Sequence, residues 1–219
     1  MSGAPRYRTV VLDVDSTLTG IEGVDWLAAR RETETASGVM RLTERVMAGE
    51  MPIEKAYAAR LERIAPTRLE VAALAEAYRD AVAPDARAAI ASLQAAGVRV
   101  LAISGGLRDA VLPFCTGLGI ADADVHAVKL RWNADGEYTG FDRRSPLVKQ
   151  TGKARMLQRL ALPRPILAVG DGSTDVEMRR AGEADAFAAY TGFTHRARVV
   201  EAADFVVRSF AELTERVLR

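Results

Sequence analysis

The sequence predicts an α/β fold: a doubly wound parallel sheet with a small helical cap domain inserted after the first strand. Short apolar runs alternate with helical segments along most of the chain, as in proteins whose strands lie buried between two layers of helices. Residues 21–82 break this alternation, because they contain helical patterns and no convincing strand. We therefore expect a core formed by residues 1–20 and 83–219 and a helical cap formed by residues 21–82.

The expected strands are short, uninterrupted apolar runs, and the first is rich in β-branched residues. They cover residues 9–12, 98–103, 165–169, 184–188 and 204–207. Two helices with clear ends lie between these strands. One covers residues 86–96 and ends at Gly97, and the other covers residues 152–162 and ends at Pro163.

Residues 125–141 show a different pattern. Val128, Leu130 and Trp132 alternate with polar residues and lead into the turn-forming residues 133–136. Alternation followed by an Asp-Gly turn is typical of a β-hairpin. We expect a hairpin here that shields part of the sheet.

Composition excludes several classes of protein. The 219 residues carry a formal net charge of +1, which gives no sign of a surface for nucleic acid or membrane. Cys115 is the only cysteine, so an internal disulfide and a multi-cysteine metal site are excluded. No apolar run is long enough to span a membrane, and a strand starting at residue 9 leaves no room for a signal peptide. We expect a cytoplasmic protein, either a monomer or a homodimer.

The most informative motif is the pair Asp13 and Asp15, directly after the first expected strand. In open α/β sheets, ligands bind beyond the carboxyl ends of the strands, so both acids are placed for function. A carboxylate there can act as a nucleophile, a proton carrier or a ligand for Mg²⁺. The alternative is that these acids only form a turn or cap a helix, as Ser16 or Thr17 could also do.

Two further strands end in residues suited to a functional site. Ser104, Gly105 and Gly106 follow the second strand, and glycines let backbone N–H groups approach an anion closely. Ser104 could instead cap the helix that follows. Asp171 and Asp175 come after the third strand. We expect the ends of the three strands to converge on one site.

Lysine is rare in this chain. Of the 30 lysines and arginines, the lysines are Lys55, Lys129, Lys149 and Lys153. Lys153 opens the helix before the third strand and is the candidate for neutralising the acids, with Lys149 as the fallback. Two like charges 4 Å apart repel by about 4 kcal/mol at an effective dielectric of 20, so clustered acids hold protons or bind a cation. Donors that are all oxygen favour Mg²⁺ over zinc, and the whole set indicates phosphoryl transfer.

At these motifs the chain resembles the haloacid dehalogenase superfamily and, within it, the phosphoserine phosphatases, along nearly its whole length. Four family motifs occur in order. They are Asp13-Val14-Asp15-Ser16-Thr17, Ser104-Gly105-Gly106, Lys153, and Gly170-Asp171-Gly172 with Asp175. The helical segment after the first motif resembles the family's cap. The resemblance implies an Mg²⁺-dependent phosphomonoesterase that hydrolyses O-phospho-L-serine through an aspartyl-phosphate intermediate, in serine biosynthesis.

The resemblance also implies a role for each residue that handles the phosphoryl group. Asp13 would attack phosphorus. Asp15 would protonate the leaving oxygen and then deprotonate the water that hydrolyses the intermediate. Ser104, the backbone N–H of Gly105 and Lys153 would hold the phosphoryl oxygens and stabilise the charge that rearranges in the transition state.

The same resemblance implies a set of residues around the metal. Mg²⁺ would be bound by Asp13, the backbone carbonyl of Asp15 and Asp171, and Asp175 would support this set from behind. Thr174 is expected among the substrate-binding residues. It stands where the family usually has an asparagine, and a threonine offers one donor instead of two.

Substrate selection is expected in the cap. Glu22 matches the family glutamate that receives the substrate ammonium, and Arg60 matches the arginine that receives its carboxylate. Met47 and Ile53 would form a wall of the same pocket. The alternatives are that Glu22 only complements a helix start, that Arg60 is a solvated side chain, and that both apolar residues belong to the core.

Other interpretations keep the chemistry and change the substrate, or replace catalysis with binding. The substrate could be another small phosphomonoester, such as phosphohomoserine, a phosphorylated amine or a sugar phosphate. Ile53 stands where the family often has an aromatic residue, and Val14 stands where it usually has phenylalanine. A phosphoacceptor signalling protein would not need Asp15 as a leaving-group acid. A binding protein with a dead phosphatase fold would be expected to lose Asp13, Asp15 or Lys153.

Overall fold

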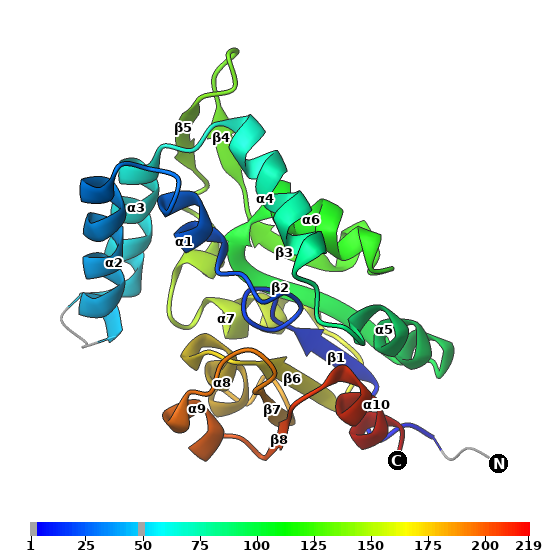
Figure 1. Cartoon of the computed structure of the whole chain (residues 1–219). Coiled ribbons are helices and arrows are strands. Elements are labelled where there is room, and N and C mark those ends of the chain that lie inside the picture. Colours follow the sequence, from blue (N-terminus) through cyan, green and yellow to red (C-terminus); the bar gives the residue numbers. More distant parts are fainter. Residues whose placement is uncertain (1–3, 48–50) are drawn as a thin grey trace.

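A six-stranded parallel sheet forms the centre of the molecule in the computed structural model, which describes residues 4–47 and 51–219. The strand order is β3-β2-β1-β6-β7-β8, and β4 and β5 form a separate antiparallel pair (Figure 1). The strands are β1 (Thr9–Leu12), β2 (Arg99–Leu107), β3 (Val125–Val128), β4 (Leu130–Trp132), β5 (Tyr138–Phe141), β6 (Ile166–Gly170), β7 (Ala186–Tyr190) and β8 (Phe205–Val207). The parallel order confirms the predicted α/β class.

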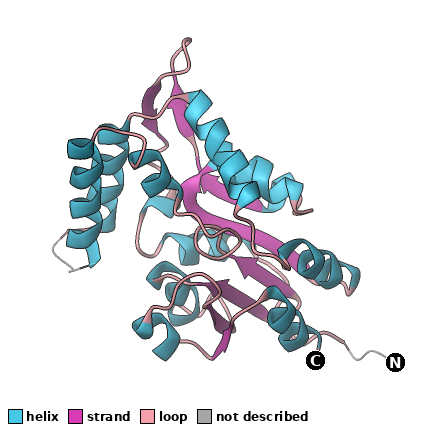
Figure 2. Cartoon of the chain, viewed as in Figure 1, coloured by secondary structure: helices cyan, strands magenta, loops and turns pink. Residues whose placement is uncertain are grey.

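Helices cover both faces of this sheet, as Figure 2 shows. They are α1 (Gly23–Ala28), α2 (Thr33–Met47), α3 (Ile53–Ile64), α4 (Arg68–Asp80), α5 (Ala86–Ala95), α6 (Arg108–Gly117), α7 (Gly152–Leu160), α8 (Ser173–Arg180), α9 (Ala197–Glu201) and α10 (Phe210–Leu218), with 3-10 turns η1 (Asp122–Asp124) and η2 (Pro146–Val148). Helices α5 and α10 pack together on one face, and α7 and α8 pack together on the other. None of the described helices is long and apolar enough to cross a membrane.

Strand β1 lies in the middle of the sheet and is fully buried. It pairs in parallel with β2 on one side and β6 on the other, with Leu12 opposite Ala102 and Val169. A strand covered on both faces needs an unbroken apolar sequence, which Thr9–Leu12 supplies. Because three neighbouring parallel strands end at one edge, the residues that follow them come together there.

The helical insert, residues 21–82, contains α1 to α4 and leaves and rejoins the core at one place. Gly20 N donates to Ala81 O at 3.0 Å, and Ala83 N donates to Leu18 O at 2.9 Å. Helix α4 begins with a capping box, in which Thr67 Oγ1 accepts from Glu70 N at 3.2 Å. Its described elements are helices, as expected. That the insert forms a separate domain stays a prediction.

The expectation for residues 125–141 is partly wrong. Residues 125–128 form β3, the edge strand of the main sheet, and only β4 and β5 form the hairpin. The hairpin contacts the start of α4, where Arg68 N donates to Gly136 O at 2.8 Å. It therefore projects beside the helical insert, at the top of Figure 1. Val125 and Val128 are buried in this edge strand. The sequence could not show this, because an edge strand and a hairpin strand can have the same alternating pattern.

Candidate active site

The ends of β1, β2 and β6 place acidic and polar side chains at one edge of the sheet. Asp13 follows β1 and continues its pairing with β6, because Asp13 N donates to Val169 O at 2.9 Å. Asp171 follows β6, and Ser104 lies near the end of β2. Asp13, Asp171 and Ser104 are all buried. The structure therefore brings together the three strand ends as the sequence predicts.

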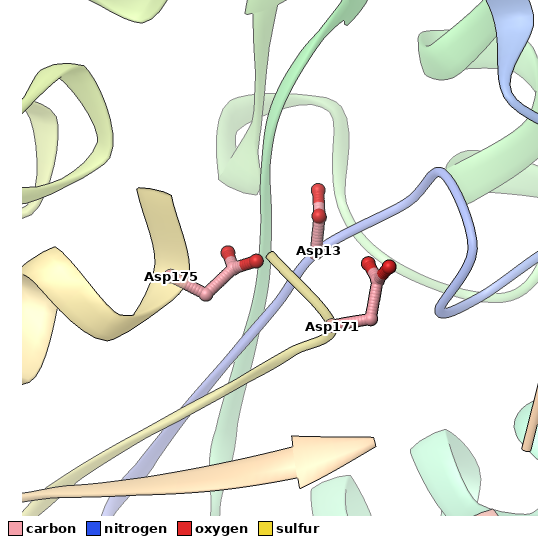
Figure 3. Close-up of side chains that lie close together, drawn as sticks. All are labelled: Asp13, Asp171 and Asp175. Atoms are coloured by element: carbon pink, nitrogen blue, oxygen red, sulfur yellow. The ribbon is translucent and has the colours of Figure 1, made fainter. Parts of the chain in front are cut away.

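Asp13, Asp171 and Asp175 form an acidic cluster, whose carboxylate oxygens lie within 4.8 Å of one another (Figure 3). Burial and then repulsion by Asp175 raise the pKa of Asp13 to about 7, although Lys153 opposes this. Burial and then repulsion by Asp13 raise the pKa of Asp171 to about 7. Three buried oxygen donors that repel one another fit a hard divalent cation.

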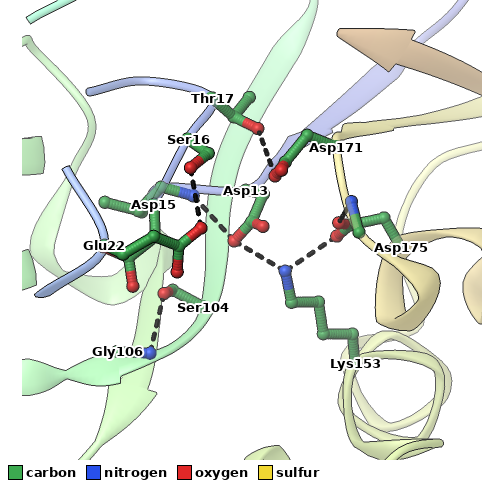
Figure 4. A network of polar contacts seen from close by, with 12 residues as sticks. Asp13, Asp15, Ser16, Thr17, Glu22, Ser104, Gly106, Lys153, Asp171 and Asp175 are labelled. Atoms are coloured by element: carbon green, nitrogen blue, oxygen red, sulfur yellow. Dashed lines mark hydrogen bonds and ion pairs between the residues drawn. The ribbon is translucent and has the colours of Figure 1, made fainter. Parts of the chain in front are cut away.

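Lys153 lies between two of these acids. Its Nζ is 2.6 Å from Asp13 Oδ1 and 2.7 Å from Asp175 Oδ1, and its side chain is 6% exposed (Figure 4). Burial alone would lower the pKa of Lys153, but attraction to Asp13 and then Asp175 outweighs it and raises the pKa. The lysine is therefore a fixed positive charge beside Asp13.

Asp175 is held from two sides. Its Oδ1 contacts Lys153, and its Oδ2 accepts from Gly172 N at 3.1 Å. Gly170 makes room for this carboxyl group, because a Cβ at residue 170 would lie 2.2 Å from Asp175 Cγ. Thr174 is the neighbouring residue in α8 and is half-buried. With both oxygens engaged, Asp175 holds Lys153 in place.

The Ser104–Gly106 segment belongs to the end of β2 and not to the loop after it. Ser104 Oγ accepts from Gly106 N at 2.8 Å, and the N-terminal cap of α6 is Leu107. The alternative that Ser104 caps this helix is therefore wrong. Tyr57, in α3 of the helical insert, donates its hydroxyl to Gly105 O at 2.9 Å. This bond joins the insert to the strand end.

Asp15 lies beside the acidic cluster with partners of its own. Tyr78 donates its hydroxyl to Asp15 Oδ1 at 2.5 Å. Burial and then repulsion by Glu22 raise the pKa of Asp15 well above its ordinary value, although hydrogen bonds from Tyr78 and Gly23 N oppose this. A raised pKa favours the protonated form of the carboxyl group, which is the form that a general acid requires.

Glu22 lies at the start of α1, next to the first motif. Its Oε1 accepts from Ser16 Oγ at 2.7 Å and lies 3.4 Å from Arg196 Nη2. The side chain is 44% exposed, so part of it faces solvent. The structure therefore places Glu22 beside Asp15, within reach of a group bound there.

Arg60 lies in α3 and pairs with Asp25, an acid of α1. The distance from Arg60 Nη2 to Asp25 Oδ1 is 2.5 Å. Arg60 Nε is buried and has no hydrogen-bond partner among the described residues. Ile53 begins α3 and is half-buried. Met47 ends α2, and its side chain lies outside the described part of the chain.

Several contacts come from residues that the sequence did not single out. Arg196, in the loop after β7, contacts Asp171 Oδ2 and also donates to Asp171 O at 3.1 Å. Thr194 Oγ1 donates to the same carboxyl oxygen at 2.9 Å. Neither residue lies in a motif or beside a strand end. No signal in the sequence would have identified them, because the path of the loop decides their position.

Comparison with known proteins shows the family of this chain. The sequence model of the haloacid dehalogenase-like hydrolases matches residues 7–182. An Arabidopsis thaliana protein named phosphoserine phosphatase, chloroplastic, is 34% identical over 209 residues, which cover 94% of this chain and 70% of that protein. A Homo sapiens protein named phosphoserine phosphatase is 35% identical over 207 residues, which cover 93% of this chain and 90% of that protein.

Solved structures show the same fold. A phosphoserine phosphohydrolase-like protein from Francisella tularensis superposes with a TM-score of 0.85 at 24% identity. The superposition covers 95% of this chain and 98% of that protein. The architecture of strands and helices is therefore shared over almost the whole of both chains.

Proposed function

The chain belongs to the haloacid dehalogenase-like hydrolases and, within them, to the phosphoserine phosphatase family, and we propose that its substrate is O-phospho-L-serine. The products would be L-serine and phosphate, and the reaction would serve serine biosynthesis. The 35% identity with the human phosphoserine phosphatase supports the substrate, and the observation that carries the chemistry is the buried contact of 2.6 Å between Asp13 and Lys153 at the end of β1. A carboxylate nucleophile and a fixed cation beside it are what phosphoryl transfer through an aspartyl-phosphate requires.

In the first half-reaction, Asp13 attacks phosphorus and Asp15 gives its proton to the seryl oxygen as the O–P bond breaks. Lys153 and the Ser104–Gly106 segment hold the phosphoryl oxygens and stabilise their charge. In the second half-reaction, Asp15 takes a proton from water, which attacks phosphorus and releases phosphate and free Asp13. One carboxyl group serves both steps because the second mirrors the first.

We propose Mg²⁺ as the cation held by Asp13, Asp171 and the backbone carbonyl of Asp15. Oxygen donors without histidine or cysteine support this choice. The ion would neutralise the acids and the phosphate charge when bound. Asp175 would support this set from behind, through its contacts with Lys153 and with Gly172 N.

We also propose that the helical insert acts as a cap that selects the substrate. Glu22 would receive the ammonium group, and Arg60 would receive the carboxylate. The buried and unpartnered Nε of Arg60 supports this role, because a buried donor without an acceptor is costly and a substrate carboxylate would satisfy it. Half-buried Ile53 would line the same pocket, and Thr174 would bind near the phosphate.

The first experiment measures phosphate release from a panel of small phosphomonoesters, with Mg²⁺ and then with EDTA. Phosphoserine is expected to give the highest kcat/KM, and chelator is expected to abolish turnover until Mg²⁺ is restored. Equal kcat/KM across the panel would contradict the substrate, and full activity in EDTA would contradict the metal.

A second candidate is another small phosphomonoester without a carboxylate. The pairing of Arg60 with Asp25 favours it, because this ion pair already satisfies part of the guanidinium. The same panel separates the two candidates, since a sugar phosphate or phosphorylated amine would then exceed phosphoserine in kcat/KM.

A further inference from the structure

Tyr78 of the helical insert reaches the carboxyl group of Asp15. The hydroxyl donates to Asp15 Oδ1 at 2.5 Å, and the whole Tyr78 residue is 0% exposed. In this bond the phenol hydroxyl is the donor and the carboxyl oxygen is the acceptor. The tyrosine is therefore a hydrogen-bond donor to one oxygen of Asp15.

The surroundings of Tyr78 fix the position of its hydroxyl. The ring packs against Phe114 of α6, with 5.4 Å between ring centroids. Gly23 of α1 leaves the space for the hydroxyl, because a Cβ at that residue would lie 2.2 Å from Tyr78 Oη. Helices from the insert and the core therefore meet around this bond.

The other oxygen of Asp15 faces the Ser104–Gly106 segment. A Cβ added to Gly106 would lie 3.3 Å from Asp15 Oδ2 and 3.0 Å from Ser104 Oγ. The two oxygens of Asp15 are therefore distinguished by their neighbours. Oδ1 accepts from Tyr78 of the insert, and Oδ2 faces the strand end where the phosphoryl group would be held, while Gly23 N also donates to this carboxyl group.

We propose that Tyr78 is a positioning residue that orients Asp15 so that Oδ2 carries the proton to the leaving oxygen. The inference rests on the proposed function, in which Asp15 is the general acid. In that step the Oδ2–H bond and the ester O–P bond break, while the alcohol O–H bond and the Asp13–P bond form. Tyr78 keeps its own proton throughout and contacts neither substrate nor phosphate.

This role predicts a dependence on the leaving group. A serine alkoxide is a strong base, so its departure requires a correctly placed proton, whereas p-nitrophenolate leaves without one. Loss of the Tyr78 hydroxyl is therefore expected to slow cleavage of phosphoserine and to spare cleavage of p-nitrophenyl phosphate. A defect in folding or metal binding would slow both substrates equally.

The experiment compares the wild-type enzyme with Tyr78→Phe and measures the rate at which the alcohol is released in a single turnover. Serine release is expected to fall about 10- to 100-fold, the range for a misplaced general acid, while p-nitrophenol release changes less than about twofold. The substrate concentration that half-saturates the single-turnover rate should stay the same for both substrates, because Tyr78 does not bind them. Equal slowing of both substrates, or no slowing of either, would overturn the proposal.

Gly23→Ala supplies an independent test, which also stands if Tyr78→Phe fails to fold. The added methyl group would push the Tyr78 hydroxyl away from Asp15 and should reproduce the selective loss. The double variant should lose no more than the larger single loss, because both changes remove one bond. Additive losses, or a Gly23→Ala enzyme with wild-type serine release, would contradict the proposal.

Tyr190→Phe is the matched control, because Tyr190 is buried in β7 and packs against Phe193 and Phe210. It should release both alcohols at the wild-type rate. Failure of the proposed function looks different, since the wild-type enzyme itself would then not hydrolyse phosphoserine. The Tyr78 proposal fails by itself where the wild type turns over both substrates and the variants show one of the contradicting outcomes given above.

Discussion

The strand ends of the sheet and the helical insert both bring charged side chains to the site, but with different kinds of partner. At the strand ends, Lys153 pairs with Asp13 and Asp175, all buried and all contributed by the core. In the insert, Arg60 pairs with Asp25, whose side chain is 44% exposed. The first pairing keeps the groups in one arrangement, whereas we expect the second to be exchanged for a pairing with substrate.

The difference indicates where chemistry and selectivity are encoded. A buried ion pair cannot lose one partner cheaply, because the other charge would remain in a site of low polarity. An ion pair with an exposed partner contributes little to stability and is replaced at little cost. We therefore expect changes at the strand ends to affect every substrate and changes in the insert to affect substrates selectively.

The largest expected effect is that of Asp13→Asn. An amide cannot form the aspartyl-phosphate, so kcat should fall more than about 1000-fold for every substrate. The measurement is phosphate release, with circular dichroism as the check on folding. Asp122→Asn, which changes an acid on the surface near α6, should keep wild-type activity. Turnover retained by a folded Asp13→Asn enzyme would exclude Asp13 as the nucleophile.

Lys153→Met is expected to lower kcat about 100- to 1000-fold, the range for losing one donor to the transition-state charge. The variant should also unfold more easily by about 3–5 kcal/mol, because Asp13 and Asp175 lose their buried cation. Urea denaturation and phosphate release measure the two losses. Lys129→Met, at an exposed lysine, is the control. A stable and active Lys153→Met enzyme would show that the strand-end pairing is dispensable.

Arg60→Ala tests the other side of the comparison. KM for phosphoserine should rise about 10- to 100-fold, as expected for losing hydrogen bonds to a charged group, while KM for p-nitrophenyl phosphate stays near the wild-type value. Steady-state kinetics give KM for both substrates. Arg63→Ala, an exposed arginine of the same helix, should change neither. Equal increases for the two substrates would mean that Arg60 does not bind the carboxylate.

The smallest expected effect concerns stability and pH. The pKa values of Asp13 and Asp171 are raised to about 7, so the folded protein binds these protons more tightly than the unfolded chain does. The stability they contribute is present below their ordinary pKa near 4 and is lost as the pH rises through 7. The free energy of unfolding without metal should therefore fall by on the order of 1–2 kcal/mol between pH 5.5 and 8.

Thermal unfolding with EDTA and with Mg²⁺ measures this effect. Each kcal/mol of stability is expected to shift Tm by about 2–4 °C. Mg²⁺ should raise Tm more at pH 8, where the acids are ionised, than at pH 5.5. Glu70 of the insert should not contribute in this range, because its hydrogen bond with Arg31 lowers its pKa to about 2. An equal effect of Mg²⁺ at both pH values would contradict the titration of the acidic cluster.

The sequence predicts the strand-end groups well because their positions depend on short-range rules. An apolar run followed by Asp13 or Asp171 places the acid at the end of a buried strand, and parallel neighbours bring such ends together. The insert is predicted as helical for the same reason, since its periodicity is local. Helix α7 ends at Leu160, two residues earlier than expected, because Ala161 adopts the left-handed conformation.

Contacts made across the fold could not be predicted. Tyr78 follows Val71, Leu74 and Ala75 at helical spacing, so its sequence context matches an ordinary core residue. Its hydroxyl becomes significant only because the insert folds back over Asp15. The edge strand β3 was assigned to the hairpin because one alternating pattern continues through both, and only the pairing with β2 distinguishes them.

The hydrogen bonds of Gly20 with Ala81 and of Leu18 with Ala83 place the two ends of the helical insert next to each other. Joining the chain across this gap would require only a short turn, and the sheet would not have to stretch to accept an insert of another length. The helices between these two chain ends could therefore be replaced by other helices without changing the sheet. Engineers could use this position to combine the strand-end chemistry of this protein with a different choice of phosphate ester.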